Sequence, residues 1–461
     1  MKRAYKILVA SIVAALVVCA SAVADPPDRV GRLNFIAGGV SFQPADTNGW
    51  ASATLNYPLT AGDSLWTDGA SRAEVHVGST AIRLGPASEL SFLELDDRRV
   101  QIILPRGLLN VRLRQQDPGE SFQIDTPTMS VLILGPGSYR LEVREWGDTQ
   151  ATVSEGAMQA LVAGQSYSIR ARQSAFVAQS DWLSLELDRA PAADEWDRWC
   201  AGRDSREDRL ASVRYVPRSM VGCEDLDWYG NWNETSEYGP VWIPSSLPAG
   251  WAPYKFGRWA WVQPWGWTWI DDQPWGFAPF HYGRWAVFLG VWVWVPGSIL
   301  HRPVYAPALV AFVGAGQGGA IRNGNFRWFP LGPREAYVPP YQASREYIQK
   351  VNIRHVRIDD HQRIEAPNVQ YVHRDAYRAQ GDANRDPPQV FAQVLQQLFT
   401  AAVRNDEERK QKAVTAERKQ AEVRRAPKEQ KERKEQKLQK VRKKKKLPNG
   451  QWVWVEEWVE E

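Results

Sequence analysis

The chain has 461 residues, of which 44% are hydrophobic and 24% are charged, a composition typical of a globular protein with more than one domain. Its formal net charge of +4 is unevenly distributed, because residues 401–461 contain 19 Lys and Arg against 12 Asp and Glu, whereas residues 25–400 carry a net charge of −6. DNA-binding domains concentrate basic side chains on their folded part, so the mildly acidic body argues against a DNA-binding domain.

Residues 1–24 have the pattern of a secretory signal peptide. Basic residues precede an apolar run over residues 7–18, and a small-residue site ends at Ala24, directly before Asp25. We therefore expect cleavage between Ala24 and Asp25 and a periplasmic or secreted mature protein. The alternatives are an uncleaved membrane anchor and a lipoprotein modified at Cys19. No later stretch of the sequence is long and apolar enough to predict a second membrane span.

Residues 29–179 alternate between apolar and polar side chains, as residues 73–77 and 139–143 illustrate. Clusters of Gly, Pro and Asp interrupt this alternation at short intervals, as they do between the strands of β-proteins. Many short strands with no helical window between them predict an all-β domain, built as a roll, a sandwich or a solenoid.

Several short motifs in this region form a set. They are Gly62-Asp63, Ser71-Arg72-Ala73-Glu74-Val75, Ile82-x-Leu84-Gly85-Pro86, Phe122-x-Ile124-x-Thr126-Pro127 and the stretch from Gly135 to Tyr139. With this set the region resembles the FecR domain, which is named for the ferric citrate regulator. The resemblance implies a periplasmic β-domain that contacts proteins or cell-wall components. In the regulators the domain follows a cytoplasmic anti-sigma segment and a membrane helix, and the resemblance does not extend to those two parts.

Residues 181–226 contain apolar residues at helical spacing, among them Leu183 and Leu187, and we expect one or two helices that connect two domains. Cys200 and Cys223 are the two cysteines that follow the predicted cleavage site. In an oxidising compartment such a pair predicts a disulfide, which would tie the far end of the connector back to its helix. The alternative is a pair of unrelated buried thiols.

Residues 227–341 contain 14 of the 23 Trp. An aromatic-Gly-x-Trp motif recurs at Gly230, Gly257 and Gly283, and each copy leads through a turn to a further Trp-containing stretch. We expect each repeat to be a β-hairpin and the three hairpins to pack together, because an isolated hairpin is marginally stable in water. With its closing stretch over residues 328–341, the region is similar to an uncharacterised domain that follows FecR domains in exported bacterial proteins.

The Trp-rich region also supplies the candidate ligand-binding residues. Exposed indoles stack on the apolar faces of sugar rings, so such a surface predicts a site for peptidoglycan or another polysaccharide. The interpretation that we favour over an exposed site is that the rings form the core of the hairpins, and both arrangements can hold at once. The two arginines that recur at one position of the repeat are expected either to stack on neighbouring rings or to lie in solvent. The candidate residues are Arg258, Trp259, Trp267, Trp269, Arg284, Trp285, Trp292 and Trp294.

The C-terminal part changes from extended to helical and then to basic sequence. We expect loose structure over residues 342–388 and an amphipathic helix from residue 389, which leads into a partly disordered basic tail up to residue 450. A Lys-rich arm of an exported protein predicts peripheral contact with anionic lipid or wall polymers, the alternative being a charged linker. The basic cluster consists of Lys443, Lys444, Lys445 and Lys446.

The last residues repeat a pattern of the Trp-rich region. Residues 451–455 match residues 291–295 at four of five positions. We expect residues 451–461 to behave as a strand that can add to an edge of the Trp-rich module, in its own chain or in a neighbouring one. Self-association through this segment is therefore a hypothesis.

We recognise no catalytic, metal or cofactor motif in the sequence. Residues 314–319 formally fit a dinucleotide-binding motif, but no helix is expected after them, so we interpret them as a glycine loop. Asp271-Asp272 is interpreted as a turn rather than an acid pair, and the six His are scattered. We expect a non-enzymatic envelope protein that acts in binding, assembly or signal relay, with envelope proteins or anionic polymers rather than nucleic acid as partners. The alternatives are a polysaccharide-binding module and, less favoured, an envelope hydrolase.

Overall fold

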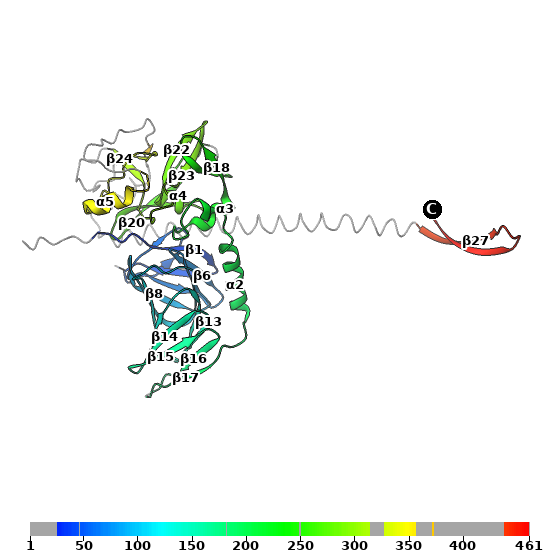
Figure 1. The fold of residues 1–461 in the computed structure, drawn as a ribbon, viewed down its shortest axis with the longest axis horizontal. Helices are drawn as coiled ribbons and strands as arrows, with labels where there is room; N and C mark the ends of the chain where they lie inside the picture. Colours follow the sequence, from blue (N-terminus) through cyan, green and yellow to red (C-terminus); the bar gives the residue numbers. More distant parts are fainter. Residues whose placement is uncertain are drawn as a thin grey trace, which may run out of the picture. The chain divides into compact units, whose positions relative to one another are not determined.

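The computed structural model describes residues 25–45, 47–180, 182–248, 250–313, 327–355, 371–372 and 438–460 (Figure 1). The chain divides into two compact units, residues 1–396 and 397–461. The predicted signal peptide, the glycine loop and the predicted helix that starts at residue 389 lie outside the described residues.

The N-terminal part of the first unit is built from strands β1 to β17, which form two connected sheets and confirm the predicted all-β domain. The first sheet contains β1 (Gly31–Ala37), β4 (Pro58–Leu59), β6 (Arg72–Val77), β7 (Thr80–Leu84), β12 (Gly137–Val143), β13 (Thr149–Glu155), β16 (Gln173–Val177) and β17 (Leu185–Arg189). The second sheet contains β2 (Val40–Gln43), β3 (Ala51–Ser52), β5 (Ser64–Thr67), β8 (Glu89–Leu95), β10 (Ser121–Asp125), β11 (Ser130–Ile133), β14 (Ala157–Val162) and β15 (Gln165–Arg170).

Strand β9 (Arg99–Leu113) belongs to both sheets. Its first half pairs with β8 and β10, and its second half pairs with β7 and β12. Gly107 stands where β9 changes sheet, with φ +96°, and a Cβ at this position would lie 2.4 Å from the backbone of Ser88. Glycine is therefore required at the bend, because other residues are strained at positive φ and would clash here. Between the sheets lies a core of alternate aliphatic side chains such as Val75, Val111 and Leu141.

The connector begins with a strand rather than a helix. Residues 185–189 form β17, which pairs with β16 at the edge of the first sheet. Leu183 and Leu187 fit strand alternation as well as helical spacing, so their pattern did not separate the two structures. The predicted helices follow as α2 (Glu195–Glu207) and α3 (Cys223–Tyr229), with a short 3-10 turn at Ser212–Arg214 between them.

Each of the three Trp-rich repeats forms an antiparallel hairpin, as predicted. The hairpins are β18 (Gly230–Thr235) with β19 (Gly239–Pro244), β20 (Gly257–Val262) with β21 (Gly266–Asp271), and β22 (Arg284–Phe288) with β23 (Val291–Val295). Strand β19 also pairs with β23, so the first and third hairpins form a four-stranded sheet.

The recurrent glycine of each repeat packs against an indole of the following strand. A Cβ on the glycine would lie within 2.6 Å of a ring atom in all three repeats, so only glycine admits the indole at this distance. The repeated unit is therefore a glycine and the tryptophan that covers it. The pairs are Gly230 with Trp242, Gly257 with Trp269, and Gly283 with Trp294.

Short elements complete the first unit, and one of them differs from expectation. Residues 345–352 form a helix within a region for which loose structure was predicted, and the Ser344 side chain caps that helix by accepting a hydrogen bond from the Tyr347 N–H. In the described part of the chain, no helix has the length and apolar character needed to cross a membrane. The elements are α4 (Ala278–His281), β24 (Val310–Val313), β25 (Arg327–Pro330), α5 (Arg345–Asn352) and β26 (Tyr371–Val372).

In the second unit, the described residues form one hairpin of β27 (Leu438–Lys446) and β28 (Trp452–Glu460). Residues 443–446, predicted to lie in a disordered tail, are thus part of a strand. The terminal segment was expected to be a strand and is one, and the pairing described for it is with β27 of its own unit.

Candidate functional site

Glu74 on β6 is the centre of a buried group of charged side chains. Its carboxylate is fully buried and accepts hydrogen bonds from Arg83 at 2.5 Å, from Arg203 at 2.5 and 2.6 Å, and from Asn34 at 2.8 Å. Arg83 lies opposite Glu74 on β7, whereas Arg203 extends from α2. Burial by itself raises the pKa of Glu74, but hydrogen bonds from His76 and Arg203 hold that pKa well below its usual value. Glu74 is therefore ionised inside the protein.

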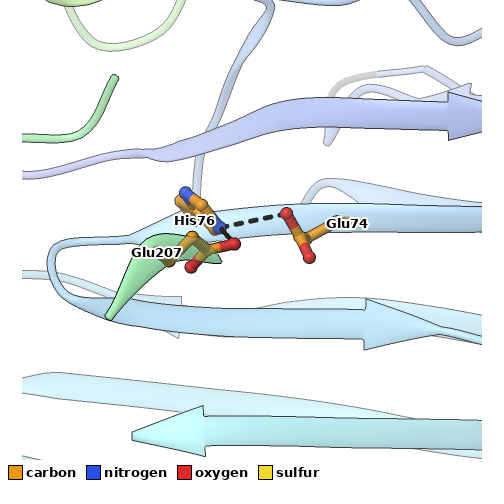
Figure 2. Close-up of side chains that lie close together, drawn as sticks. All are labelled: Glu74, His76 and Glu207. Carbon is orange, nitrogen blue, oxygen red and sulfur yellow. Dashed lines mark ion pairs between the residues drawn. The ribbon is translucent and has the colours of Figure 1, made fainter. Parts of the chain in front are cut away.

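His76 follows two residues later on the same face of β6 (Figure 2). Its Nε2 lies 3.1 Å from Glu74 and 3.5 Å from Glu207, the last residue of α2, while its Nδ1 lies 2.9 Å from Glu224. Burial by itself lowers the pKa of His76, but the negative charges of Glu224 and Glu207 outweigh burial and raise it well above its ordinary value. The imidazole is therefore protonated at neutral pH and donates from both nitrogens.

Two carboxylates of α2 fix that helix on the first sheet. Asp204 lies 2.8 Å from Arg83 and 3.0 Å from Arg114, and Glu207 lies 3.0 Å from Arg114. Arg83 belongs to β7 and Arg114 directly follows β9, so both guanidinium groups come from the sheet. Together with the Arg203 contact to Glu74, these ion pairs cover the outer face of the sheet with α2.

Arg32 on β1 connects the sheets with the Trp-rich module. Its guanidinium is 1% exposed and pairs with Glu224 at 2.8 Å and with Asp225 at 2.5 Å, both at the start of α3. The same group donates to the carbonyl of Pro274, which lies in the Trp-rich module, at 2.9 Å. It also donates to Asn56, whose amide in turn donates to carbonyls of the loop that contains Pro274.

These charges balance. Four guanidinium groups and the protonated His76 face five carboxylates, apart from Asp208, which is 43% exposed and lies 2.7 Å from Arg114 at the edge of the group. Burial by itself raises the pKa of Glu224, but His76 and Arg32 hold it at about 2, so this carboxylate is ionised as well. We refer to the group as the ionic junction, and its members are Arg32, Glu74, His76, Arg83, Arg114, Arg203, Asp204, Glu207, Glu224 and Asp225.

Glu74, His76 and Glu207 bring three potential metal ligands within 4.8 Å of one another (Figure 2). A set of one imidazole and two carboxylates suits a divalent cation chemically. Both carboxylates, however, are already paired with arginines, and His76 would have to give up the proton that it shares with Glu224. The contacts therefore favour a proton over a metal ion at this position.

A pocket beside the ionic junction has a volume of about 20 Å³, which is room for about one water molecule. Sites for organic ligands are more than ten times larger, about 300 Å³ or more. The arrangement is therefore suited to holding parts of the chain together rather than to binding a substrate. The polar residues that line the pocket include His76, Arg114, Glu207, Arg218 and Glu224.

The sequence matches two protein-family models. The FecR protein family matches residues 63–159, and the family of unknown function DUF6600 matches residues 223–335. The chain contains a FecR domain followed by a DUF6600 domain. Glu74, His76 and Arg83 lie in the first of these matches, while Glu224 and Asp225 lie in the second. The ionic junction is thus where the FecR domain, α2 and the DUF6600 domain meet.

Solved structures offer only weak similarity. Two crystal structures of a candidate anti-sigma factor from Parabacteroides distasonis are 13% and 12% identical to the chain, each with a TM-score of 0.27. The first similarity covers 30% of this chain and 65% of the other protein, and the second covers 40% and 99%. At this TM-score neither carries an inference. No curated protein matches the sequence significantly.

The DUF6600 domain holds most of the predicted ligand-binding residues in its interior. The indole N–H groups of Trp285 and Trp294 donate to backbone carbonyls at 2.9 Å, as buried indoles generally must. These side chains therefore form a core, which is one of the two arrangements expected from the sequence, and not a continuous exposed strip. Trp259, Trp269, Arg284, Trp285 and Trp294 are buried, and Arg258, Trp267 and Trp292 are partly buried.

The two recurrent arginines have contacts other than the expected stacking on a Trp ring. Arg284 donates to the carbonyls of Gly283 and Glu335 and to the Asn352 side chain, at 2.8 to 3.1 Å. Arg258 lies 3.5 Å from Asp272. Because buried guanidinium groups need acceptors more than they need a ring face, hydrogen bonding decides where Arg284 points.

One aromatic pair of the predicted surface region does reach solvent. Trp261 and Trp267 lie opposite each other on β20 and β21, and their rings meet edge to face with centroids 5.6 Å apart. Trp261 is 45% exposed. Trp267, one of the predicted residues, thus contacts an exposed indole, whereas Trp261 itself was not among the predicted residues.

Cys200 and Cys223 are both buried free thiols, so the structure does not contain the predicted disulfide. Cys200 lies within α2, whereas Cys223 begins α3 and lines the small pocket. Burial raises the pKa of Cys200 to about 12 and raises that of Cys223 well above its usual value. Both thiols are thus protonated and unreactive in the fold. Spacing alone could not distinguish a bonded pair from two thiols with separate surroundings.

The ionic junction was not found from the sequence. Glu74 and His76 alternate with apolar residues on a strand, and such positions normally face water. A usable signal existed in α2, where Arg203 and Glu207 are four residues apart and share a helix face. Arg203 and Glu207 carry charges opposite to those of Glu74 and Arg83 on the sheet, respectively. Only the tertiary fold, however, shows that these residues pair.

Proposed function

We propose that this protein is a non-enzymatic component of the bacterial cell envelope that relays protein binding from its FecR domain to its DUF6600 domain. The observation that carries the proposal is the ionic junction. A buried ion network contributes little net stability, but any displacement leaves a buried charge without its partner. The two domains therefore move together, as a relay requires. The predicted signal peptide supports the envelope location.

The FecR domain offers a surface for a protein partner. Leu132 on β11 and Leu161 on β14 are 36% and 50% exposed, and their registers place them as diagonal neighbours on one face of the second sheet. Leu134, two residues after Leu132, is 50% exposed as well. Apolar side chains gathered on a solvent face are typical of protein-binding surfaces. We refer to Leu132, Leu134 and Leu161 as the leucine face.

The test for a partner is photo-crosslinking in cells, with the crosslinker placed at Leu161. We expect a defined crosslinked protein that disappears when Leu132→Asp is added. The matched control places the crosslinker at Leu300, which is 87% exposed on the DUF6600 domain. The same crosslinked protein from both positions, or from neither, would contradict a partner at the leucine face.

The test for the relay is hydrogen exchange on the intact protein with the crosslinked partner, once purified. Partner binding should raise amide protection in α3, on the far side of the ionic junction. In the Arg32→Met variant the partner should still bind, but protection in α3 should not change. Equal responses in both proteins would show that the junction does not transmit binding.

A second candidate function is polysaccharide binding, and the exposed pair Trp261 and Trp267 is the observation in its favour. Soluble peptidoglycan fragments should then bind the wild-type protein and should bind Trp261→Ala about fivefold more weakly, since each aromatic stack contributes about 1 kcal/mol. Trp182→Ala is the matched control, because Trp182 is 88% exposed outside this pair. Equal losses in both variants would exclude a site at Trp261.

A further inference from the structure

The terminal hairpin places indoles and ammonium groups on one face. Lys444 lies opposite Trp454, and Lys446 lies opposite Trp452. Residues directly opposite each other in an antiparallel pair share a face, and alternate residues of one strand do so as well. These four side chains, Lys444, Lys446, Trp452 and Trp454, therefore form what we call the Trp–Lys face.

The opposite face of the same stretch has a different composition. It carries Lys443 opposite Val455 and Lys445 opposite Val453. The two faces thus have equal numbers of lysines and differ in their apolar side chains, indole on one and valine on the other. This symmetry of charge supplies a matched control for any test of the Trp–Lys face.

The Trp–Lys face is open in the structure. Trp452 and Trp454 are 62% and 63% exposed, and they belong to a two-stranded hairpin. A two-stranded hairpin is marginally stable in water by itself and becomes stable when one face packs on something else. A large exposed indole surface on such a hairpin therefore indicates a binding face that a partner covers in the functional state.

The charges identify what covers it. Residues 442–446 are five consecutive cations. Arg442 pairs with Glu456 at 2.9 Å, and among the described side chains of the hairpin Lys444 and Lys446 form no ion pair with a carboxylate. The surface that complements this face is anionic and also accepts indole rings. A bilayer that contains anionic lipid has both properties, because Trp and Lys settle together at the headgroup level and anionic headgroups attract each lysine.

The ring contacts argue against the other polyanions. The ammonium group of Lys444 lies 5.1 Å from the ring centroid of Trp454, and that of Lys446 lies 5.8 Å from Trp452. Stacking of a sugar or a nucleobase needs an open ring face, and here a lysine occupies one face of each ring and competes with such a ligand for the indole. At a bilayer surface the same arrangement is favourable, because the ammonium reaches the phosphate while the ring enters the interface.

We propose that the Trp–Lys face docks on the surface of an anionic lipid bilayer, with Trp452 and Trp454 in the headgroup region and Lys444 and Lys446 on lipid phosphates. This contact is separate from the protein relay proposed above. Loss of membrane binding would leave the leucine face unaffected, so the two proposals fail independently.

The experiment is co-sedimentation of the full chain with phosphatidylcholine vesicles and with mixed phosphatidylcholine and phosphatidylglycerol vesicles. We expect binding to the mixed vesicles only. The double variant Lys444→Gln and Lys446→Gln should bind about 30-fold more weakly, from a contribution of about fivefold per lysine. The matched variant Lys443→Gln and Lys445→Gln removes the same charge from the opposite face and should lose clearly less.

The Trp pair gives a second arm. At high salt the attraction of lysines to lipid is screened, so the vesicle binding that the lysine variants keep there depends on the indoles. The double variant Trp452→Ala and Trp454→Ala should lose this salt-resistant binding. The double Trp variant also removes packing from the hairpin and could lose binding for that reason. The comparison of the two lysine variants is therefore the test on which the proposal depends. Equal loss in both lysine variants would overturn the proposal. So would equal binding to neutral vesicles, or capture of a soluble anionic polysaccharide with no binding to vesicles.

Discussion

The ionic junction and the terminal hairpin use similar side chains in opposite ways. In the junction, each guanidinium lies against a carboxylate, and the group is buried and balanced. In the hairpin, residues 442–446 are cationic and exposed, and the lysines of the Trp–Lys face lie over indoles. The comparison teaches that the pairing of charges matters more than their number. Balanced charges fix the fold, and unbalanced ones are available to a partner.

The largest effect expected from this comparison is on stability. Arg83→Met should lower the free energy of unfolding by about 3–5 kcal/mol, because it leaves Glu74 and Asp204 with a buried charge that has lost a partner. Lys444→Met in the hairpin should change it by about 0.5 kcal/mol or less. Urea denaturation followed by Trp fluorescence measures both. Similar losses of unfolding free energy in the two variants would contradict the idea that charges stabilise the fold in the junction but not in the hairpin.

A pH titration tests the charge of His76. Below about pH 6.5 His76 is protonated in the folded and the unfolded chain, so its stabilising effect is fully present. As pH rises toward the raised pKa of the folded state, only the folded chain holds the proton, and the free energy of unfolding should fall by about 1.4 kcal/mol per pH unit. The carboxylates that face the ring are Glu74, Glu207 and Glu224. The lowered pKa values of Glu74 and Glu224 keep these two ionised over the whole range.

The control for this titration is His76→Gln, which keeps a hydrogen-bonding side chain but cannot be protonated. Its unfolding free energy should lack the fall above pH 6.5 that the wild-type protein shows. Parallel curves for the two proteins would mean that the imidazolium does not contribute to the junction.

A thiol titration measures whether solvent reaches the edge of the ionic junction, since Cys223 lines the pocket beside it. A thiol reagent at neutral pH should label neither Cys200 nor Cys223 in the native protein, because both are buried and protonated. In denaturant without reductant both should be labelled. If they are labelled only after reduction, the chain forms the disulfide that the sequence suggested and the structure lacks.

The smallest effect is expected from metal. Because Glu74 and Glu207 are already paired with arginines, added zinc or EDTA should move the thermal midpoint by less than about 1 °C, which corresponds to well under 1 kcal/mol. Magnesium serves as the control for ionic strength. A zinc-dependent rise that His76→Gln abolishes would make the position a metal site after all.

The sequence was sufficient for the elements whose pattern is local. Alternation predicted the strands of the FecR domain, and the recurrence of Gly257 and Gly283 predicted hairpins, because each glycine marks where an indole must fit. It was not sufficient for the burial of side chains such as Trp294, since a Trp-x-Trp strand looks the same as core or as surface. The ionic junction was invisible for a related reason, because Arg32 and Glu224 are distant in sequence and only the fold pairs them.

Strand β9 has a consequence for how the FecR domain is made. It pairs with β7 and β8, which precede it, and with β10 and β12, which follow it, so neither sheet is complete until β9 is in place. The domain cannot assemble as two independent halves, since both would lack the same strand. A chain cut in the bend at Gly107 would leave each fragment with half of β9 and with strands of both sheets, so the fragments should recover the fold only when they are mixed.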